Sequence, residues 1–211
     1  MNIAVRSTED QKKELIEKGF GKSVIVNWID KNEKLSCTNA DVFFDLTFNT
    51  PIPVNDALSD TNLVFVHSVN HTCKEINKPN YIRLNAWKGF LKRPVIEFAC
   101  ADIESKKKAE VVFNELGWKY AWVGDDYGFI AARIIAMIVN EAYFALEENV
   151  STKEQVDIAM KLGTNYPYGP FEWSEKIGLV NILNLLRKLA WQNERYSISA
   201  LLVHECQQFE I

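Results

Sequence analysis

Apolar and polar positions follow one another in short runs over the first 125 residues. Runs of four or five mostly apolar residues between polar turns are typical of buried β-strands. They lie at Asn2–Val5, Val24–Trp28, Val42–Leu46, Leu63–His67, Tyr81–Asn85, Val95–Phe98 and Tyr120–Val123. Helical spacing predicts helices at Glu9–Lys18 and Ser105–Leu116, the second closed by Gly117. Strands that alternate with helices predict a largely parallel, layered α/β sheet.

The pattern changes to a helical period after Gly128. Apolar residues recur every three or four positions, which predicts a long, mostly buried helix over residues 128–147. Ser151 and Glu154 have the spacing of a capping box, which predicts a second helix that ends at Gly163. Two more helical stretches follow a proline-rich turn, at 171–177 and 179–191. We therefore predict an α/β domain over residues 1–125 and an all-α domain over residues 126–211.

Composition and charge exclude several classes of partner. The chain has 211 residues, of which 47% are hydrophobic and 25% charged, as in soluble globular proteins. The net charge is −4 and the basic residues are scattered, so we expect no nucleic-acid partner. The run Lys106–Lys108 is interpreted as a solvated helix face. No run approaches the roughly 20 apolar residues of a membrane span, so we expect no membrane partner.

The cysteines and histidines give no sign of a metal site or of disulfide bonds. Cys37, Cys73, Cys100 and Cys206 are far apart and show no C-x-x-C spacing. His67, His71 and Cys73 are neighbours in sequence but lack a carboxylate at ligand spacing, so we expect no bound metal. The first residues are already strand-like, which argues against a signal peptide. We therefore expect a cytoplasmic protein.

A dense set of motifs occupies residues 128–184, GFIAARIIAMIVNEAYFALEENVSTKEQVDIAMKLGTNYPYGPFEWSEKIGLVNIL. It includes an N-E-A, a D-x-A-M-x-x-G, a P-x-G-P-F-E and an I-G-L, in order and at matching spacing. This stretch resembles the C-terminal helical domain of 3-hydroxyacyl-CoA dehydrogenases, 3-hydroxybutyryl-CoA dehydrogenases among them. The resemblance implies an all-α, 6-phosphogluconate dehydrogenase C-terminal-like dimerisation domain over residues 126–211. It implies a truncated Rossmann-like, NAD-binding-type domain over residues 1–125.

The glycine loop of that family has been replaced in this chain. The family binds its cofactor on a G-x-G-x-x-G loop, whose glycines allow the backbone and the helix N-terminus to approach the pyrophosphate. The three glycine positions correspond here to Ser7, Glu9 and Lys12. Ser7 and Asp10 have the spacing of a capping box, and two acidic residues disfavour a diphosphate. We therefore expect a self-capped helix and no bound cofactor.

The resemblance also assigns the catalytic positions. Setting the sequence VIE on the family's equivalent strand places the catalytic Glu at Glu97, which we interpret as a strand-end carboxylate. The catalytic His, twelve residues earlier, falls on Asn85. Asparagine does not titrate, so it can hold a substrate oxygen but cannot serve as the general base.

Four further residues are candidates for substrate binding by the same comparison. Lys88 and Ala132 stand where the family has asparagines, and Arg133 keeps the arginine of the family's G-F-x-x-N-R helix start. His67 begins the stretch that replaces the family's N-T-S-S motif, and it could supply a base from another strand.

Two main functions and a third remain open at this level. The favoured one is a pseudoenzyme of fatty-acid metabolism that forms a homodimer and holds an acyl-CoA-like molecule, or has a regulatory or structural role. The alternative is an active NAD-dependent 3-hydroxyacyl-CoA or 3-hydroxybutyryl-CoA dehydrogenase with non-standard site residues. The third is a structural subunit that pairs with an authentic dehydrogenase.

Overall fold

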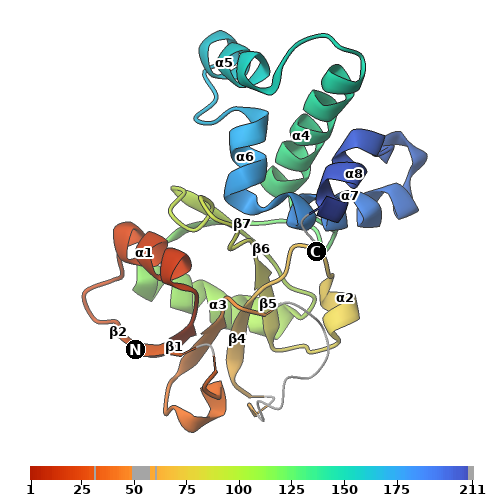
Figure 1. The fold of residues 1–211 in the computed structure, drawn as a ribbon. Helices are drawn as coiled ribbons and strands as arrows, with labels where there is room; N and C mark the ends of the chain where they lie inside the picture. Colours follow the sequence, from red (N-terminus) through yellow and green to blue (C-terminus); the bar gives the residue numbers. More distant parts are fainter. Residues whose placement is uncertain (31, 49–57, 60, 209–211) are drawn as a thin grey trace. The chain divides into compact units, whose positions relative to one another are not determined.

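A computed structural model describes residues 1–30, 32–48, 58–59 and 61–208 (Figure 1). The chain divides into two compact units, unit 1 (Met1–Phe129) and unit 2 (Ile130–Ile211). The elements of unit 1 are β1 (Asn2–Arg6), α1 (Glu9–Lys18), β2 (Ile25–Ile29), the 3₁₀ helix η1 (Leu35–Cys37), β3 (Val42–Asp45), β4 (Leu63–His67), α2 (Cys73–Ile76), β5 (Tyr81–Leu84), β6 (Val95–Ala99), α3 (Ile103–Leu116) and β7 (Lys119–Trp122). Those of unit 2 are α4 (Ala131–Glu147), α5 (Lys153–Thr164), α6 (Pro170–Ile177), α7 (Leu179–Gln192), the 3₁₀ helix η2 (Glu194–Tyr196) and α8 (Ala200–Gln208).

The strands of unit 1 form one seven-stranded sheet in the order β2-β1-β3-β4-β5-β6-β7. All neighbours are parallel except β5 and β6, so the prediction of a largely parallel α/β sheet is confirmed. From β1 the chain adds β2 on one side and then β3 on the other. We call the carboxyl ends of β1 and β3 the switch point, because open α/β sheets bind their ligands where the strand order reverses in this way.

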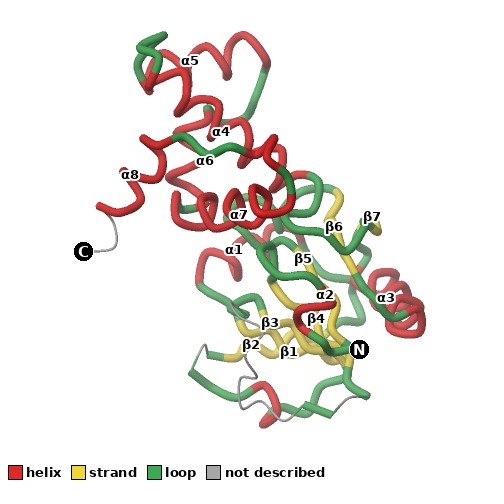
Figure 2. Tube along the Cα trace, turned by 90° about the vertical axis from the view of Figure 1, so that its right-hand side faces the viewer, coloured by secondary structure: helices red, strands yellow, loops and turns green. Residues whose placement is uncertain are grey.

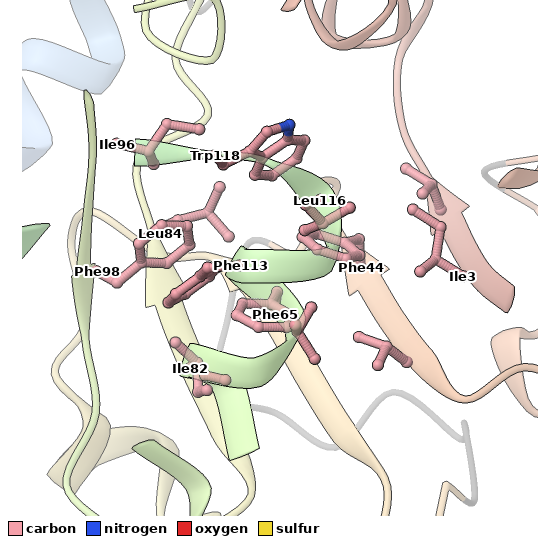
Figure 3. Packing of buried hydrophobic residues seen from close by; sticks show 14 of the residues in the cluster. Ile3, Phe44, Phe65, Ile82, Leu84, Ile96, Phe98, Phe113, Leu116 and Trp118 are labelled. Atoms are coloured by element: carbon pink, nitrogen blue, oxygen red, sulfur yellow. The ribbon is translucent and has the colours of Figure 1, made fainter. Parts of the chain in front are cut away.

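The two faces of the sheet carry separate apolar clusters, because successive side chains of a strand point to opposite faces. Ile3 and Val5 of β1 belong to the larger cluster, and Ala4 between them belongs to the smaller one. Helices α1 and α3 cover the larger cluster, in which Phe98 lies 4.3 Å from Phe113 between ring centroids (Figure 3). In the same cluster Phe44 of β3 stacks on Phe65 of β4 with 4.5 Å between ring centroids, so the aromatic packing reaches a strand that borders the switch point.

Unit 2 is made of helices and loops in its described residues, and the strands lie in unit 1 (Figure 2). Helix α4 contacts α5, α6, α7 and α8, which explains its long apolar sequence. It buries Ile135, Val139 and Tyr143 on the inner face of the unit. In the part of the chain that is described, no helix is long and apolar enough to cross a membrane.

Two local predictions need correction, and one strand pair departs from the parallel pattern. The cap of α1 is Thr8 with Gln11, not Ser7 with Asp10, because the box requires a side chain long enough to reach back to the N-cap amide. Helix α5 is capped by Thr152, one residue later than predicted. The strand pair β5 and β6 is antiparallel, with Leu84 opposite Phe98, because the loop between them is too short for a parallel crossover.

Helix α2 was not predicted from the sequence. Thr72 caps it and Glu75 completes a capping box, a T-x-x-E signature that is present in the sequence. At four residues the helix is too short to show an apolar period, so only this cap could have revealed it.

Candidate functional site

The switch point and its surroundings hold most of the predicted site residues of unit 1. Ser7 follows β1, His67 ends β4 and Asn85 follows β5, so the parallel strands bring these three positions to the same edge of the sheet. We therefore describe this edge first, beginning with the turn between β1 and α1.

The turn between β1 and α1 binds its own side chains. The Thr8 hydroxyl accepts the N–H of Gln11 at 3.3 Å, and the Gln11 carbonyl oxygen Oε1 accepts the N–H of Thr8 at 2.9 Å. Gln11 Nε2 also donates to the backbone oxygens of Leu46, at 2.9 Å, and Ala86, at 3.2 Å. Gln11 thus connects the first turn of α1 to the end of β3 and to the segment after β5. The N–H groups that Thr8 and Gln11 use are of the kind that hold a phosphate at a helix N-terminus.

The residues at the three glycine positions keep their side chains around this turn. Ser7 is half-buried and Glu9 is exposed. Lys12 is half-buried and places its ammonium 5.2 Å from the centre of the Trp28 ring.

The inner face of α1 is bound to the loop over residues 86–93. Glu14 is buried, and its carboxylate accepts the N–H groups of Gly89 and Leu91, the second at 3.2 Å. A carboxylate that accepts two backbone N–H groups is a strong local contact. Together with Gln11, it holds the loop against the helix.

Charged side chains extend this contact along the helix. Lys18 donates from Nζ to the backbone oxygen of Arg93 at 2.6 Å. Lys88 pairs with Asp10 at 2.9 Å, and both side chains are about half exposed. Lys88, predicted as a substrate contact, therefore binds α1. We call the set formed by Asp10, Gln11, Glu14 and Lys18 with residues 86–93 the helix–loop clamp.

Asn85 and Glu97 lie near the end of the β5–β6 strand pair. The register pairs Leu84 with Phe98; Asn85 is the residue after Leu84, and Glu97 is the residue before Phe98. Asn85 is 4% exposed; its Oδ1 accepts the N–H of Trp87 at 2.9 Å, while Nδ2 has no hydrogen-bond partner among the described residues. Glu97 is half-buried in the middle of β6, so its interpretation as a strand-end residue was wrong.

His67 is held as a neutral ring. Its Nδ1 accepts the N–H of Ala86 at 2.9 Å, which leaves the proton on Nε2. Burial lowers the pKa of His67 to about 4, although the nearby Asp45 carboxylate opposes this shift. Along β4, alternation puts His67 on the face of Phe65, whereas Glu97 lies on the face opposite Phe98. The structure therefore does not pair His67 with Glu97.

Asp30 was missed by the sequence analysis. It directly follows β2, and in dinucleotide-binding domains an acidic residue about 20 positions after the glycine loop holds the ribose hydroxyls. Here Asp30 Oδ1 accepts the N–H of Asn32 at 2.9 Å in a local turn. The spacing between Ser7 and Asp30, close to that of such an acidic residue, was the signal in the sequence that could have identified Asp30.

Two ion pairs, each with a buried arginine, support this edge, and both were also missed. Arg6 binds Asp45 through Nη2 at 2.6 Å, joining the ends of β1 and β3. Arg83 is fully buried and donates to Asp125 at 2.5 Å and to the backbone oxygen of Ser68 at 3.1 Å. Each pair links distant segments, so no sequence motif could reveal it.

Asp125 also caps α2 by accepting the N–H of Cys73 at 2.7 Å. Burial raises its pKa, but the hydrogen bond from Cys73 and the charge of Arg83 outweigh burial and hold the pKa below its ordinary value. Burial raises the pKa of the Cys73 thiol to about 12.

The cysteines and histidines form no metal cluster in the described part of the chain. Cys73, Cys100 and Cys206 are free thiols, and the side chain of Cys37 lies outside the described residues.

Ala132 and Arg133 lie in the first turn of α4, in unit 2. Ala132 is fully buried, and its methyl group offers no polar contact. Arg133 is half-buried.

The family-like motifs of unit 2 hold its helices together. Asn140 of the N-E-A donates to the backbone oxygen of Ser197 at 2.8 Å and accepts the N–H of Ser199 at 3.0 Å. Asp157 of the D-x-A-M accepts the N–H of Phe171 at 2.8 Å and that of Glu172 at 3.1 Å. These contacts explain the motifs as structural.

Comparison with known sequences identifies the second half of the chain. Residues 128–207 match the model of the 3-hydroxyacyl-CoA dehydrogenase C-terminal domain. A 3-hydroxyadipyl-CoA dehydrogenase of Escherichia coli K12 is 36% identical over 113 residues, 51% of this chain and 24% of that protein. A 3-hydroxybutyryl-CoA dehydrogenase of Bradyrhizobium diazoefficiens is 40% identical over 75 residues, 36% of this chain and 26% of that protein. The chain thus spans about a quarter of the curated relatives it matches.

Solved structures extend the likeness to the whole fold. An (S)-3-hydroxybutyryl-CoA dehydrogenase of Ralstonia eutropha matches with a TM-score of 0.76 at 15% identity, over 96% of this chain and 92% of that one. A 3-hydroxybutyryl-CoA dehydrogenase of Escherichia coli K12 matches with a TM-score of 0.60 at 26% identity, over 85% of this chain and 40% of that one. Unit 1 thus has the Rossmann-like fold of these structures, and residues 128–207 are similar to the C-terminal domain of 3-hydroxyacyl-CoA dehydrogenases.

Proposed function

We propose that this protein is a pseudoenzyme of the 3-hydroxyacyl-CoA dehydrogenase family. It binds no NAD and carries out no dehydrogenation. One observation carries the proposal: the Gln11 side chain crosses the switch point and is bonded to Thr8, Leu46 and Ala86. A dinucleotide needs this place and the N–H groups of the turn for its pyrophosphate. Glu9 and Asp10, in the first turn of α1, would repel that group.

The chemistry at the sheet edge supports the same proposal. Asn85 stands where the family has its base and has no titrating group. His67 has a pKa of about 4, which makes it a weak base, and it lies on the other face from Glu97. Glu97 alone cannot replace a base held by an acidic partner.

Titration with NADH, followed by fluorescence, tests the proposal directly. We expect no quenching or binding up to about 1 mM NADH. In a separate control titration, an authentic 3-hydroxyadipyl-CoA dehydrogenase should bind NADH at micromolar concentration. Binding of NADH to this protein with micromolar affinity would sink the proposal.

We propose that the fold still holds an acyl-CoA-like molecule. The unpaired Asn85 Nδ2 is a buried donor, and such a group is costly unless a ligand oxygen accepts its hydrogen bond. Calorimetry with 3-hydroxybutyryl-CoA should give binding that Asn85→Leu weakens about tenfold, whereas Asn114→Leu, at an exposed position of α3, leaves it unchanged. Equal binding by the two variants would rule out this role for Asn85.

We also propose a homodimer formed through unit 2. Helix α5 exposes 53% of Ile158 and 83% of Leu162, one helical turn apart. Sedimentation should give twice the chain mass, and Leu162→Glu should give monomers. A monomeric wild-type protein would contradict the dimer.

A second candidate function is favoured by Asp30 and His67. Asp30 could bind ribose hydroxyls, and Nδ1 of His67 would accept the substrate proton in place of the N–H of Ala86. In this case the protein would reduce NAD with 3-hydroxybutyryl-CoA, followed at 340 nm, and His67→Asn would abolish the activity. Absence of turnover at high enzyme concentration would exclude this candidate.

A further inference from the structure

Unit 2 contains a cavity of about 470 Å³ that plays no part in the function proposed above. Its lining comes from α4, α5, α6, α7 and α8, all within one unit. Its volume lies in the range of small-molecule sites, about 300–1,000 Å³. We propose that this cavity binds a small amphipathic amine, a molecule with an apolar body and one ammonium group.

The walls suit an apolar body. Phe171 and Leu179 are buried, and Val180 is half-buried. Tyr143 is 2% exposed and packs edge-to-face against Phe171, with 5.2 Å between ring centroids. These side chains form a preformed apolar surface, which a ligand can cover without first ordering the site.

The ammonium group of Lys153 shows how the lining of the cavity holds a positive charge. Lys153 Nζ lies 2.7 Å from both carboxylate oxygens of Glu205. The same atom lies 5.3 Å from the ring centroid of Tyr143 and 5.4 Å from that of Phe171. A carboxylate beside aromatic rings is an arrangement that attracts cations.

One carboxylate of the lining has no such partner. Glu205 is neutralised by Lys153 and accepts the Tyr143 hydroxyl at 2.7 Å. Glu175 lines the cavity, is exposed, and makes neither a hydrogen bond nor an ion pair with any described residue. The lining therefore carries one uncompensated negative charge, which favours a cationic ligand and disfavours a fatty acid.

The test compares three probes of equal length on the full chain. We expect n-octylamine to bind, by calorimetry, about three- to tenfold more tightly than n-octanol, with octanoate weakest. In Glu175→Gln the ratio of the affinities for n-octylamine and n-octanol should fall to about one. Glu141→Gln, an exposed glutamate of α4 outside the cavity, should keep it.

A second variant locates the binding. Val180→Trp fills the cavity, so it should abolish binding of octylamine, while circular dichroism verifies that the helices are retained. Equal affinities for amine and alcohol, tighter binding of octanoate, or unchanged binding in Val180→Trp would each overturn the proposal. Absence of binding to a dimeric chain would also overturn it, because a second copy would then cover the cavity.

Discussion

Asp157 in unit 2 and Glu14 in unit 1 are buried carboxylates, and each accepts two backbone N–H groups. Asp157 accepts the N–H groups of Phe171 and Glu172, and it belongs to a motif that the family model matches. Glu14 accepts two N–H groups of the loop over residues 86–93, in the helix–loop clamp. Only the first of these contacts lies within the matched residues 128–207.

The difference teaches what a family match in this chain means. The matched residues of unit 2 join helices to one another, so their presence reports architecture. The positions assigned to catalysis, Asn85 and Glu97, lie in unit 1, outside the matched range. The likeness to the family therefore rests on the part of the chain that carries fewer of the candidate chemical groups.

Among the changes that test the comparison of the two units, removal of Arg83 should have the largest effect on stability. Arg83→Met removes a fully buried guanidinium that binds Asp125 and the backbone oxygens of Ser68 and Asp126, and we expect unit 1 to lose about 4 kcal/mol of unfolding free energy. Urea unfolding followed by tryptophan fluorescence measures this loss. Arg187→Met, an exposed arginine of unit 2, should change little. A small effect of Arg83→Met would show that the ion pair contributes no net stability.

The pH dependence of stability should come next in size. The folded pKa of His67, about 4, lies below its unfolded value of 6.5, so unfolding takes up a proton between these values. Stability is then lost as the pH falls from 6.5 toward 4, by about 3 kcal/mol in total. Unfolding at pH 7 and pH 4.5 should differ less in His67→Asn than in the wild type. Identical pH profiles of the two proteins would contradict a lowered pKa of His67 in the folded state.

Matched variants of the two carboxylates compare the units directly. Asp157→Asn and Glu14→Gln each replace an acceptor of two N–H groups by an amide that can satisfy only one, so each should cost about 2 kcal/mol. Denaturation midpoints provide the measurement. A loss in Asp157→Asn alone would mean that the helix–loop clamp of unit 1 is weak.

The smallest effect concerns Gln11. Gln11→Ala removes the capping box and two hydrogen bonds to backbone oxygens, and should cost about 1 kcal/mol. Thermal unfolding gives the cost, and NADH titration of the same variant should still show no binding, because Glu14 continues to hold the loop. Binding that emerged in this variant would identify Gln11 as the single obstacle.

Much of the fold could be predicted from the sequence, because apolar periods report burial directly. Strand β4 and helix α1 begin and end where the pattern placed them. The apolar pattern does not report strand direction, and the signal for the antiparallel pair β5 and β6 was the short loop between them. The α1 cap was misplaced by one residue, because Ser7 and Thr8 are both good capping residues and only the reach of Gln11 decides between them.

The candidate site was only partly accessible. The count of twelve residues between Asn85 and Glu97 relied on the resemblance, and the sheet register pairs the residues next to them, Leu84 and Phe98. The binding of Lys88 to Asp10 and of Arg83 to Asp125 joins residues far apart in sequence. Such contacts depend on tertiary structure, which a single sequence does not encode in any local pattern.

The helix–loop clamp sets a condition for protein engineering. Replacing Ser7, Glu9 and Lys12 by glycine would restore the G-x-G-x-x-G sequence of a cofactor loop. The contacts of Gln11, Glu14 and Lys18 with residues 86–93 would remain. A redesign of this turn for a dinucleotide would have to change the helix face and the loop together. Three glycines alone would leave the contact between α1 and residues 86–93 in place.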